Sequence, residues 1–237
     1  MRQQEYRLGY RADLEGLRGI AILLVVAVHT GVPWLGGGYV GVDVFFVLSG
    51  FLITGLIVRE KRTTGTLRFA DFYVRRLRRL LPALFLMLVV VCACAMLILV
   101  PEGQRQQFTL ATAASVWSSN IYLGVKQFDY FVQGTGANWF LHTWSLGVEE
   151  QFYLVWPALL VWLLGRGSTG RLKRLKAGMW LVVAASLVAC VTLTYVLPQP
   201  AFYMMPTRAW QFAAGALAWI YFIVPGTDPA ARTFTRP

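Results

Sequence analysis

One arginine and one histidine enclose the first apolar stretch of the chain, LRGIAILLVVAVHTG at residues 17–31. Arg18 and His29 are eleven residues apart, which on an α-helix is about 20° more than three full turns. Both side chains then project from one face of the helix, about 16 Å apart along its axis. An imidazole titrates near neutral pH and suits general acid–base catalysis. His29 therefore indicates either a catalytic base or a histidine hydrogen-bonded to a neighbouring helix, and both interpretations stay open.

The next apolar stretch contains a carboxylate and a hydroxyl group, Asp43 and Ser49. Asp43 could orient His29 across a helix hairpin, or it could lie in solvent at the membrane surface. A Ser49–His29–Asp43 triad is a further alternative, but the sequence lacks the nucleophile elbow that hydrolases place around such a serine.

The segment HTWSLGVEEQFYLVWP carries glutamates inside an apolar helical pattern. Glu149 and Tyr153 are four residues apart, so they share a helix face. A carboxylate at this depth in an apolar helix is costly, and we expect it to be paired or functional. His142 lies just before the apolar span and is a weaker candidate, suited to orienting a loop.

A cluster of arginines precedes Pro82 in the segment RFADFYVRRLRRLLP, and Pro82 is expected to begin the third apolar span. Within the cluster, Arg76 and Arg79 are three residues apart and share a helix face. Such clusters ordinarily lie at the cytoplasmic membrane surface and contact anionic lipids. They can also hold the phosphates of a cofactor, because a guanidinium matches phosphate oxygens with two parallel hydrogen bonds. The arginines alone leave both interpretations open.

The elements that must position these side chains are long apolar helices. Of the 237 residues, 57% are hydrophobic and 14% are charged, and the mean hydropathy is +0.56, as in a protein with several membrane spans. Glycines in the second span are expected to let a neighbouring helix pack closely. These are Gly41, Gly50 and Gly55. We expect an all-α, polytopic transmembrane bundle of about six spans, at Leu17–Trp34, Tyr39–Val58, Leu80–Val100, Ser145–Leu164, Gly178–Leu197 and Pro206–Val224.

The basic residues predict the topology of this bundle. With a cytoplasmic amino terminus, six spans place most of the 22 Lys and Arg residues on the cytoplasmic side, as the positive-inside rule requires. A seventh span at 108–125 would break this pattern, so we expect residues 101–144 to form an external loop with a partly buried or re-entrant piece. The cytoplasmic groups are Arg2, Arg7, Arg11 and Arg18, then Arg59 to Arg79, Arg166 to Lys176, and Arg232 with Arg236.

Charge and cysteine content argue against two other kinds of site. Topology accounts for the formal net charge of +11, and no soluble basic face for nucleic acid is visible. Cys92, Cys94 and Cys190 all lie in apolar spans. An odd set without Cys-x-x-Cys or Cys/His spacing indicates neither a disulfide framework nor a metal site.

These segments together resemble the acyltransferase 3 family, the integral-membrane acyltransferases that modify bacterial surface polysaccharides. The resemblance implies transfer of an acyl group, commonly acetyl, from acyl-CoA at the cytoplasmic face to a hydroxyl of a surface or exported carbohydrate. It also implies the cytoplasmic membrane of a bacterium as the location, and no permanently bound cofactor. The matching segments are GLRGIAILLVVAVH, GGGYVGVDVFFVLSGFLIT, FYVRRLRRLLP, HTWSLGVEEQFYLVWP and TRAWQFAAGALA, in this order.

The resemblance further implies roles for individual residues. Arg18 and His29 match the family's arginine–histidine motif, which carries the reaction. Arg76 and Arg79 match an arginine pair linked to the acyl-CoA donor, and Glu149 matches the glutamate of a WSLxVE motif. We expect His29 to act as general base on the acceptor hydroxyl, by direct attack on the thioester or through an acyl-histidine.

Family members generally have more spans than the six predicted here, and some add an external SGNH-type domain. We therefore expect residues 1–225 to be the N-terminal part of the membrane domain, and residues 226–237 to be an unstructured tail. Two other functions remain as alternatives. One is a transporter that uses His29, Asp43 and Glu149 as a proton or substrate path, and the other is an inactive membrane scaffold.

Overall fold

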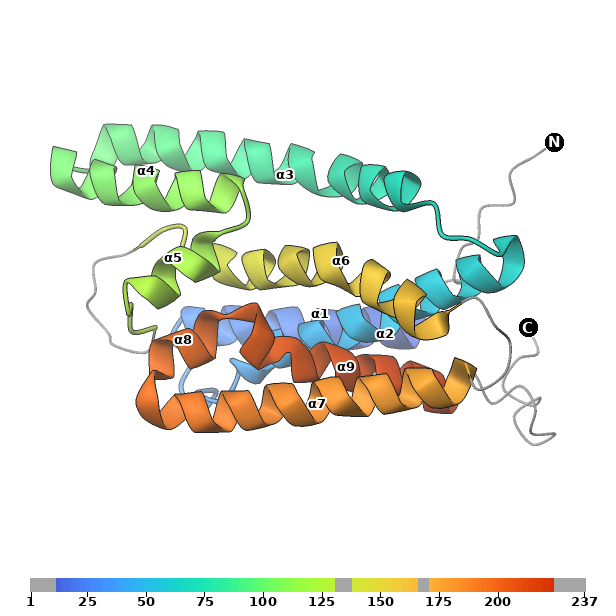
Figure 1. Cartoon of the computed structure of the whole chain (residues 1–237). Helices are drawn as coiled ribbons and strands as arrows, with labels where there is room; N and C mark the ends of the chain where they lie inside the picture. Colours follow the sequence, from blue (N-terminus) through green and yellow to red (C-terminus); the bar gives the residue numbers. More distant parts are fainter. Residues whose placement is uncertain (1–11, 131–137, 166–170, 224–237) are drawn as a thin grey trace. The chain divides into compact units, whose positions relative to one another are not determined.

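The computed structural model describes residues 12–130, 138–165 and 171–223, and these ranges contain helices and no strands (Figure 1). This confirms the predicted all-α class. The predicted tail and several of the basic residues, Arg2, Arg7, Arg11, Arg166, Arg232 and Arg236, lie outside the described residues. The helices are α1 (Ala12–His29), α2 (Val40–Thr64), α3 (Phe69–Ile98), α4 (Pro101–Ser115), α5 (Ser119–Val125), α6 (Thr143–Leu164), α7 (Arg171–Val196), α8 (Pro198–Tyr203) and α9 (Met205–Phe222).

The chain divides into two compact units. The first contains α1, α2, residues 157–164 of α6, residues 171–185 of α7 and residues 209–222 of α9. The second contains α3, α4, α5, residues 143–156 of α6, residues 186–196 of α7, α8 and residues 205–208 of α9.

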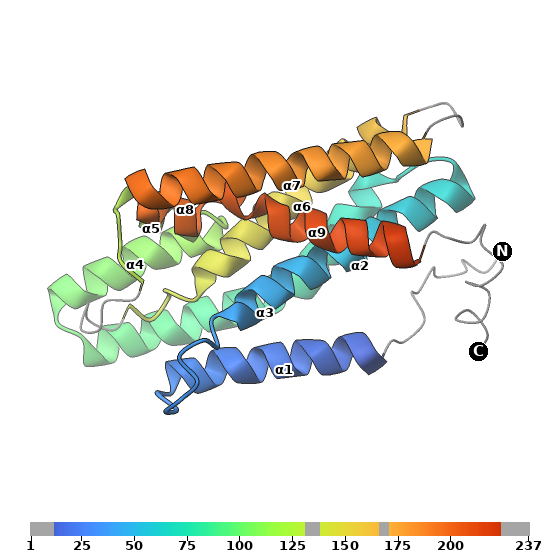
Figure 2. The ribbon, with the colours of Figure 1, turned by 90° about the horizontal axis from the view of Figure 1, so that it is seen from below.

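In the first unit, α1 and α2 form a hairpin and lie side by side (Figure 2). The chain turns through Gly31, whose φ of +69° lies in the left-handed region that favours glycine. Gly41 on α2 lies directly against the backbone of Ala21 on α1, with no room for a Cβ atom. The close approach predicted for the glycines of the second span is confirmed here.

The same small-residue packing joins α2 to α9. A Cβ atom at Gly50 would overlap the backbone of Phe212, and one at Gly215 of α9 would overlap the backbone of Val47. Beside this crossing, the rings of Phe46 and Phe212 are stacked with centroids 4.8 Å apart. Because backbone faces backbone, neither helix can move aside for a larger residue without separating the pair.

We expect Gly50→Ala to lower the free energy of unfolding by about 1–3 kcal/mol, the usual cost of overfilling a packed contact. Gly16→Ala is the matched control, because Gly16 lies in α1 with nothing within 4 Å of the added Cβ. Alanine there should leave stability unchanged or raise it by up to about 1 kcal/mol. Thermal unfolding of both variants in detergent micelles measures the difference. Equal stability of the two variants would contradict the packing at Gly50.

In the second unit, α3 and α4 run antiparallel and side by side (Figure 1). α3 begins at Phe69 and continues through Pro82, so the helix and its candidate span begin well before Pro82, where the third apolar span was expected to start. Proline removes one backbone hydrogen bond, and long apolar helices tolerate this loss. The arginines around Arg76 therefore lie within α3, a turn or more inside it.

Residues 108–125 do not form one helix. α4 ends at Ser115 and α5 begins at Ser119, and between them Trp117 has a φ of +54°. A non-glycine residue in this region breaks the helix. The prediction against a seventh continuous span at 108–125 is consistent with this break.

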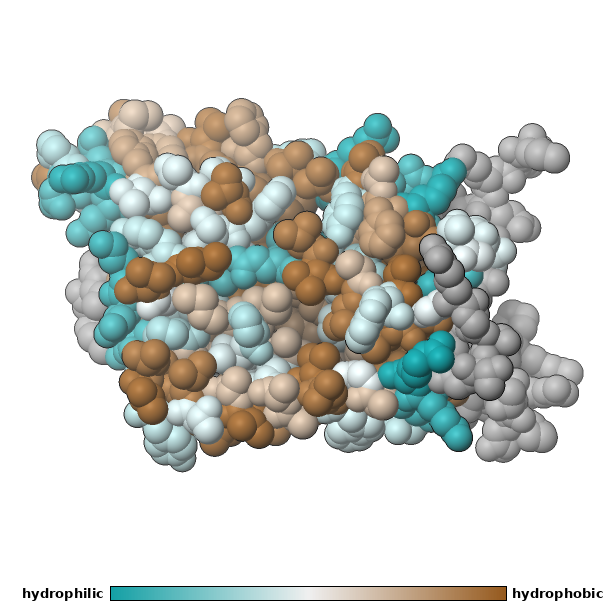
Figure 3. All heavy atoms as spheres, in the orientation of Figure 1, coloured by the Kyte–Doolittle hydropathy of each residue, from teal (hydrophilic) through white to brown (hydrophobic). Residues whose placement is uncertain are grey.

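Among the described residues, three helices are long and apolar enough to cross a membrane, at Val40–Lys61 in α2, Phe69–Ile98 in α3 and Leu172–Val196 in α7. On α7, hydrophobic side chains follow the helix and hydrophilic ones gather at the end where it begins (Figure 3). Polar side chains lower the hydropathy of α1, α6 and α9, although these helices lie where spans are predicted. They include Arg18 in α1, Glu149 and Glu150 in α6, and Arg208 and Gln211 in α9.

Candidate active site

Arg18 and His29 both lie in α1, which is one continuous helix from Ala12 to His29. Eleven residues of unbroken helix put the two side chains on one face, as the spacing predicts. The predicted end of this segment is wrong, because α1 ends at His29 and the chain turns before Trp34. His29 is therefore the last residue of a helix, with an exposed ring, and not a residue in its middle.

The contacts of His29 define which ring nitrogen is basic. Nδ1 lies 2.7 Å from the carbonyl oxygen of Val25, one turn earlier in α1. A carbonyl oxygen only accepts hydrogen bonds, so in the neutral ring Nδ1 carries the proton and Nε2 holds the lone pair. The ring also meets the ring of Tyr39 edge-on, with centroids 6.1 Å apart. Both contacts orient the imidazole ring, and Nε2 is its basic nitrogen.

Arg18 pairs with Glu15 on the preceding turn of α1, with Nη1 and Oε1 3.2 Å apart. The two side chains are 33% and 54% exposed. An ion pair this open contributes at most about 1 kcal/mol. A phosphate group can therefore compete with Glu15 for the guanidinium of Arg18.

Asp43 has a partner that the sequence analysis did not single out. Its Oδ1 accepts a hydrogen bond of 2.7 Å from Nε2 of Gln211, on α9. α2 is continuous from Val40 to Thr64, so Asp43 and Ser49 are about 120° apart around the helix. This separation argues against a triad that includes both residues.

In the second unit, Arg76 of α3 is held by two side chains of α6. Its Nη2 lies 3.5 Å from Oε1 of Glu150, and the two side chains are 28% and 12% exposed. Its guanidinium carbon lies 3.3 Å from the centroid of the Tyr153 ring, a cation–π contact. These two contacts hold the guanidinium of Arg76 against α6.

Glu149 accepts a hydrogen bond from the hydroxyl of Tyr153. The shared face of these two residues, predicted from their spacing, is confirmed, and the carboxylate is paired as expected. Tyr153 therefore contacts Arg76 with its ring and Glu149 with its hydroxyl.

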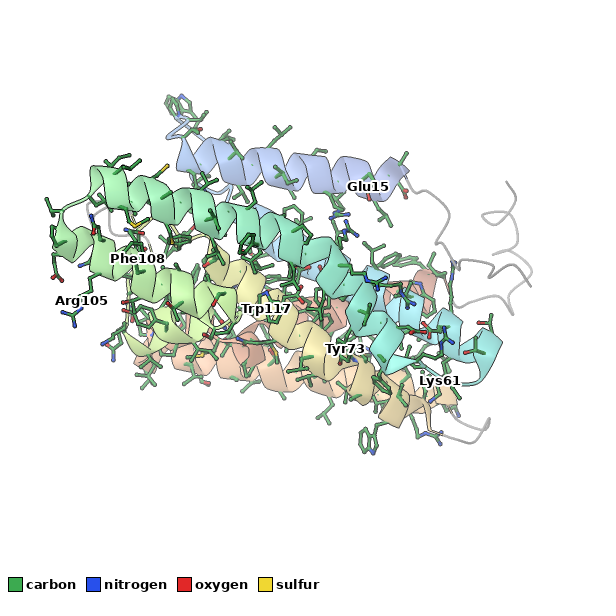
Figure 4. All side chains as sticks on the ribbon, turned by 90° about the horizontal axis from the view of Figure 1, so that it is seen from above. Glu15, Lys61, Tyr73, Arg105, Phe108 and Trp117 are labelled. Carbon is green, nitrogen blue, oxygen red and sulfur yellow. The ribbon has the colours of Figure 1, made fainter. Side chains whose placement is uncertain are left out.

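A neighbouring tyrosine ties α3 to α6 beside this cluster. The hydroxyl of Tyr73 donates a 2.9 Å hydrogen bond to the carbonyl oxygen of Leu154, and Tyr73 lies on the side of α3 towards α6 (Figure 4). This contact aligns the segment of α3 that carries Arg76 with the segment of α6 that carries Glu150.

Arg79 differs from Arg76 in its surroundings. Arg79 is exposed, and it makes no hydrogen bond or ion pair with the other described residues. Of the arginine pair that the resemblance links to the donor, one side chain is thus engaged within the protein and the other points outward.

The structure groups the predicted residues in two sets. Arg18 and His29 share one helix of the first unit, whereas Arg76, Arg79 and Glu149 belong to the second unit. Sequence reasoning missed the roles of Glu150 and Gln211. The signal for Glu150 is its position next to Glu149 in an apolar helix, where a second carboxylate also needs a partner. Gln211 lies inside the quoted motif TRAWQFAAGALA.

Comparison with known families agrees with this arrangement of motifs. The acyltransferase 3 family, described as an acyltransferase domain, matches residues 11–234. The chain belongs to the acyltransferase 3 family. The family resemblance inferred from the motifs is confirmed.

Curated relatives of this acyltransferase 3 chain are named as O-acetyltransferases. The peptidoglycan O-acetyltransferase OatA of Listeria monocytogenes is 36% identical over 228 residues, covering 93% of this chain and 35% of the relative. The O-acetyltransferase OatA of Staphylococcus aureus is 39% identical over 164 residues, covering 69% of this chain and 27% of the relative. The chain thus spans about a third or less of these relatives. No solved structure matches the chain.

Proposed function

We propose that this chain is the core of a membrane-embedded O-acyltransferase that moves an acetyl group from acetyl-CoA to a hydroxyl group of an exported glycan. The observation that carries the proposal is that Arg18 and His29 lie on one face of α1 in a chain of this family. The relatives named as O-acetyltransferases support acetyl as the group, and the peptidoglycan enzyme supports a glycan as the acceptor.

The chemistry requires a base and a protected thioester. Nε2 of His29 takes the proton of the acceptor hydroxyl while the hydroxyl oxygen forms a bond to the acyl carbon. The carbon–sulfur bond breaks, and the CoA thiolate leaves with the proton returned from the imidazolium. A location in the membrane limits access of water, which would otherwise hydrolyse the thioester. An acyl-histidine intermediate is the second route to the same ester.

The arginines supply the binding of the donor in this proposal. Arg79 contacts the CoA phosphates directly, because its side chain is exposed and a guanidinium matches phosphate oxygens. Glu150 and Tyr153 hold Arg76 against α6. Arg76 therefore acts as a positioning residue, which fixes the part of α3 that carries Arg79. Arg18 lies about 16 Å from His29 along α1, so the donor extends along the helix from arginine to imidazole.

The topology belongs to the same proposal. Six spans with a cytoplasmic amino terminus put Arg18, Arg79 and the basic start of α7 at the cytoplasmic membrane surface, where acyl-CoA is available. The three helices that meet the length and hydropathy of a span support the membrane location. The location we propose is the cytoplasmic membrane of a bacterium.

Membranes that contain the chain, incubated with acetyl-labelled acetyl-CoA and a glycan acceptor, test the proposed function. Transfer of the label to the glycan, as an ester that mild alkali removes, is the expected result. Proton-coupled uptake without labelling would indicate a transporter, and neither activity would indicate a scaffold. Each of these two outcomes contradicts the proposal.

We expect Arg79→Ala to raise the KM for acetyl-CoA by about 10- to 100-fold, because one charge-assisted hydrogen bond to phosphate contributes about 1.5–3 kcal/mol. The kcat should change much less, since Arg79 does not touch the reacting atoms. Arg105→Ala on α4 is the matched control, an exposed arginine outside the predicted cytoplasmic clusters. Initial rates over a range of acetyl-CoA concentrations give both constants. Equal KM values for the two variants would contradict the role of Arg79.

A further inference from the structure

The second unit contains a pocket of about 330 Å³, and none of the predicted catalytic or donor-binding residues lines it. Its walls come from the segment after α5, the C-terminal part of α7, α8 and the start of α9. Asp129, Tyr130, Phe202, Tyr203 and Arg208 are among the residues that line it. A volume of this size holds a small organic ligand.

Aromatic rings form one wall of the pocket. Tyr130 and Phe202 have ring centroids 5.2 Å apart, with an angle of 33° between their planes. Behind them Trp144 packs on Phe202, with centroids 4.7 Å apart. The wall is thus aromatic and apolar, which suits a ligand with an apolar ring face.

The arginine of the pocket is fixed in direction. Nε of Arg208 donates a 2.8 Å hydrogen bond to the carbonyl oxygen of Phe202. The guanidinium carbon lies 4.8 Å from the centroid of the Phe202 ring and 5.7 Å from that of Trp144. These contacts hold the planar donor group over the rings of the aromatic wall.

The polar lining can both accept and donate hydrogen bonds. Asp129 accepts, Arg208 donates and Gln199 can do both, whereas the hydroxyl of Thr194 already donates to the carbonyl oxygen of Cys190 and can accept. The hydroxyl of Tyr203 is buried and has no hydrogen-bond partner among the described residues. Burial, with Tyr130 and Asp129 nearby, raises the pKa of Tyr203, so this hydroxyl stays protonated. A ligand rich in hydroxyl groups would satisfy such a lining.

A pair of amide side chains holds the backbone of Tyr203, which lines the pocket. Asn120 of α5 and Gln151 of α6 exchange hydrogen bonds of 3.2 and 2.8 Å, and Asn120 also donates to the carbonyl oxygen of Tyr203. These bonds tie α8 to α5 and α6. The lining residue Tyr203 is therefore held by a hydrogen bond from outside α8.

The pocket lies at the far end of α7 from that helix's basic residues. Cys190 and Thr194 line it, whereas Lys173 and Arg174 lie near the start of the helix. Seventeen to twenty-one residues of α-helix span about 26–32 Å, close to the thickness of the hydrocarbon core of a bilayer. If the basic end is cytoplasmic, the pocket opens at the external surface, where an exported glycan is found.

We propose that this pocket binds one sugar residue of the acceptor glycan, with an apolar face of the sugar ring on Phe202 and Tyr130 and its hydroxyl groups bonded to Asp129 and Arg208. A saccharide combines both features of the lining, because its ring carbons present C–H groups on a flat face and its rim carries hydroxyls. The proposal rests on the proposed function, which requires a glycan acceptor.

Binding of N,N′,N″-triacetylchitotriose to the full chain tests the proposal. The protein is kept in micelles of a detergent without a sugar head group, and binding is followed by titration calorimetry. Saturable binding is expected, and Asp129→Asn and Arg208→Gln should each raise the Kd at least tenfold. Arg105→Gln, the same substitution at an exposed arginine of the second unit, should leave the Kd unchanged.

A lack of saturable binding, or equal Kd values in all variants, would overturn the proposal. Because Arg208 also bonds to the carbonyl oxygen of Phe202, Gln199→Ala provides a milder second substitution, which should also raise the Kd.

Acetyl transfer from labelled acetyl-CoA separates the two proposals. If Asp129→Asn transfers acetyl with an unchanged KM for the glycan, the pocket assignment fails and the enzyme function stands. If the sugar binds but neither the unchanged chain nor any variant transfers acetyl, the proposed enzyme function fails and the pocket assignment stands.

Discussion

The His29→Ala variant is expected to transfer acetyl groups about 10²- to 10⁴-fold more slowly than the unchanged chain, the range that a general base contributes. His29 is exposed and is the last residue of α1, so its removal leaves no cavity in a packed core. The amount of protein in the membrane should stay the same. Transfer of label from acetyl-CoA to the glycan, normalised to the protein in the membrane, measures the effect.

His142→Ala is the matched control, because the chain has only these two histidines. His142 is exposed and directly precedes α6, outside the proposed reaction path. We expect it to keep nearly full activity. Near-normal transfer by His29→Ala, or an equal loss in both variants, would remove His29 from the mechanism.

Glu150→Ala is expected to lower the free energy of unfolding by about 1–3 kcal/mol. The substitution leaves the guanidinium of Arg76, which is 28% exposed, without its carboxylate. Fully buried pairs cost about 3–5 kcal/mol to break in this way, and partial exposure reduces that cost. Glu149→Ala removes the carboxylate that bonds the Tyr153 hydroxyl and leaves the Arg76–Glu150 ion pair in place, so it should cost about 1 kcal/mol.

A double-mutant cycle separates the ion pair from other effects of these substitutions. The Arg76→Ala, Glu150→Ala double variant leaves neither charge unpaired, so its loss of stability should be smaller than the sum of the two single losses. Thermal unfolding of the four proteins in detergent micelles gives the coupling energy. Additive losses would show that Arg76 and Glu150 do not stabilise the unit as a pair.

Local patterns predicted the helices well. The apolar segments beginning near Leu17, Tyr39, Ser145, Gly178 and Pro206 all lie in helices, because long apolar stretches satisfy their backbone polar groups most easily in this form. The residues at which these helices begin and end follow less directly from the sequence. α1 ends before Trp34, and α3 begins well before Pro82, because capping and turns depend on contacts beyond the apolar pattern.

The register of Arg18 with His29, and of Glu149 with Tyr153, also follows from sequence. Within one unbroken helix, the number of intervening residues determines the angle between two side chains. The sequence also predicts that the glycines of α2 contact a neighbouring helix closely, because a missing Cβ atom leaves room for its backbone. Which backbone fills the space, that of Phe212 at Gly50, required the fold.

Side-chain partners from distant segments were decided by tertiary structure alone. Glu150 as the partner of Arg76, and Gln211 as the partner of Asp43, join residues 74 and 168 positions apart. Sequence identified the arginine, the carboxylates and the chemistry each can perform, because these properties belong to the residue and its helix. Which groups meet depends on the packing of whole helices, and no spacing along one segment contains that information.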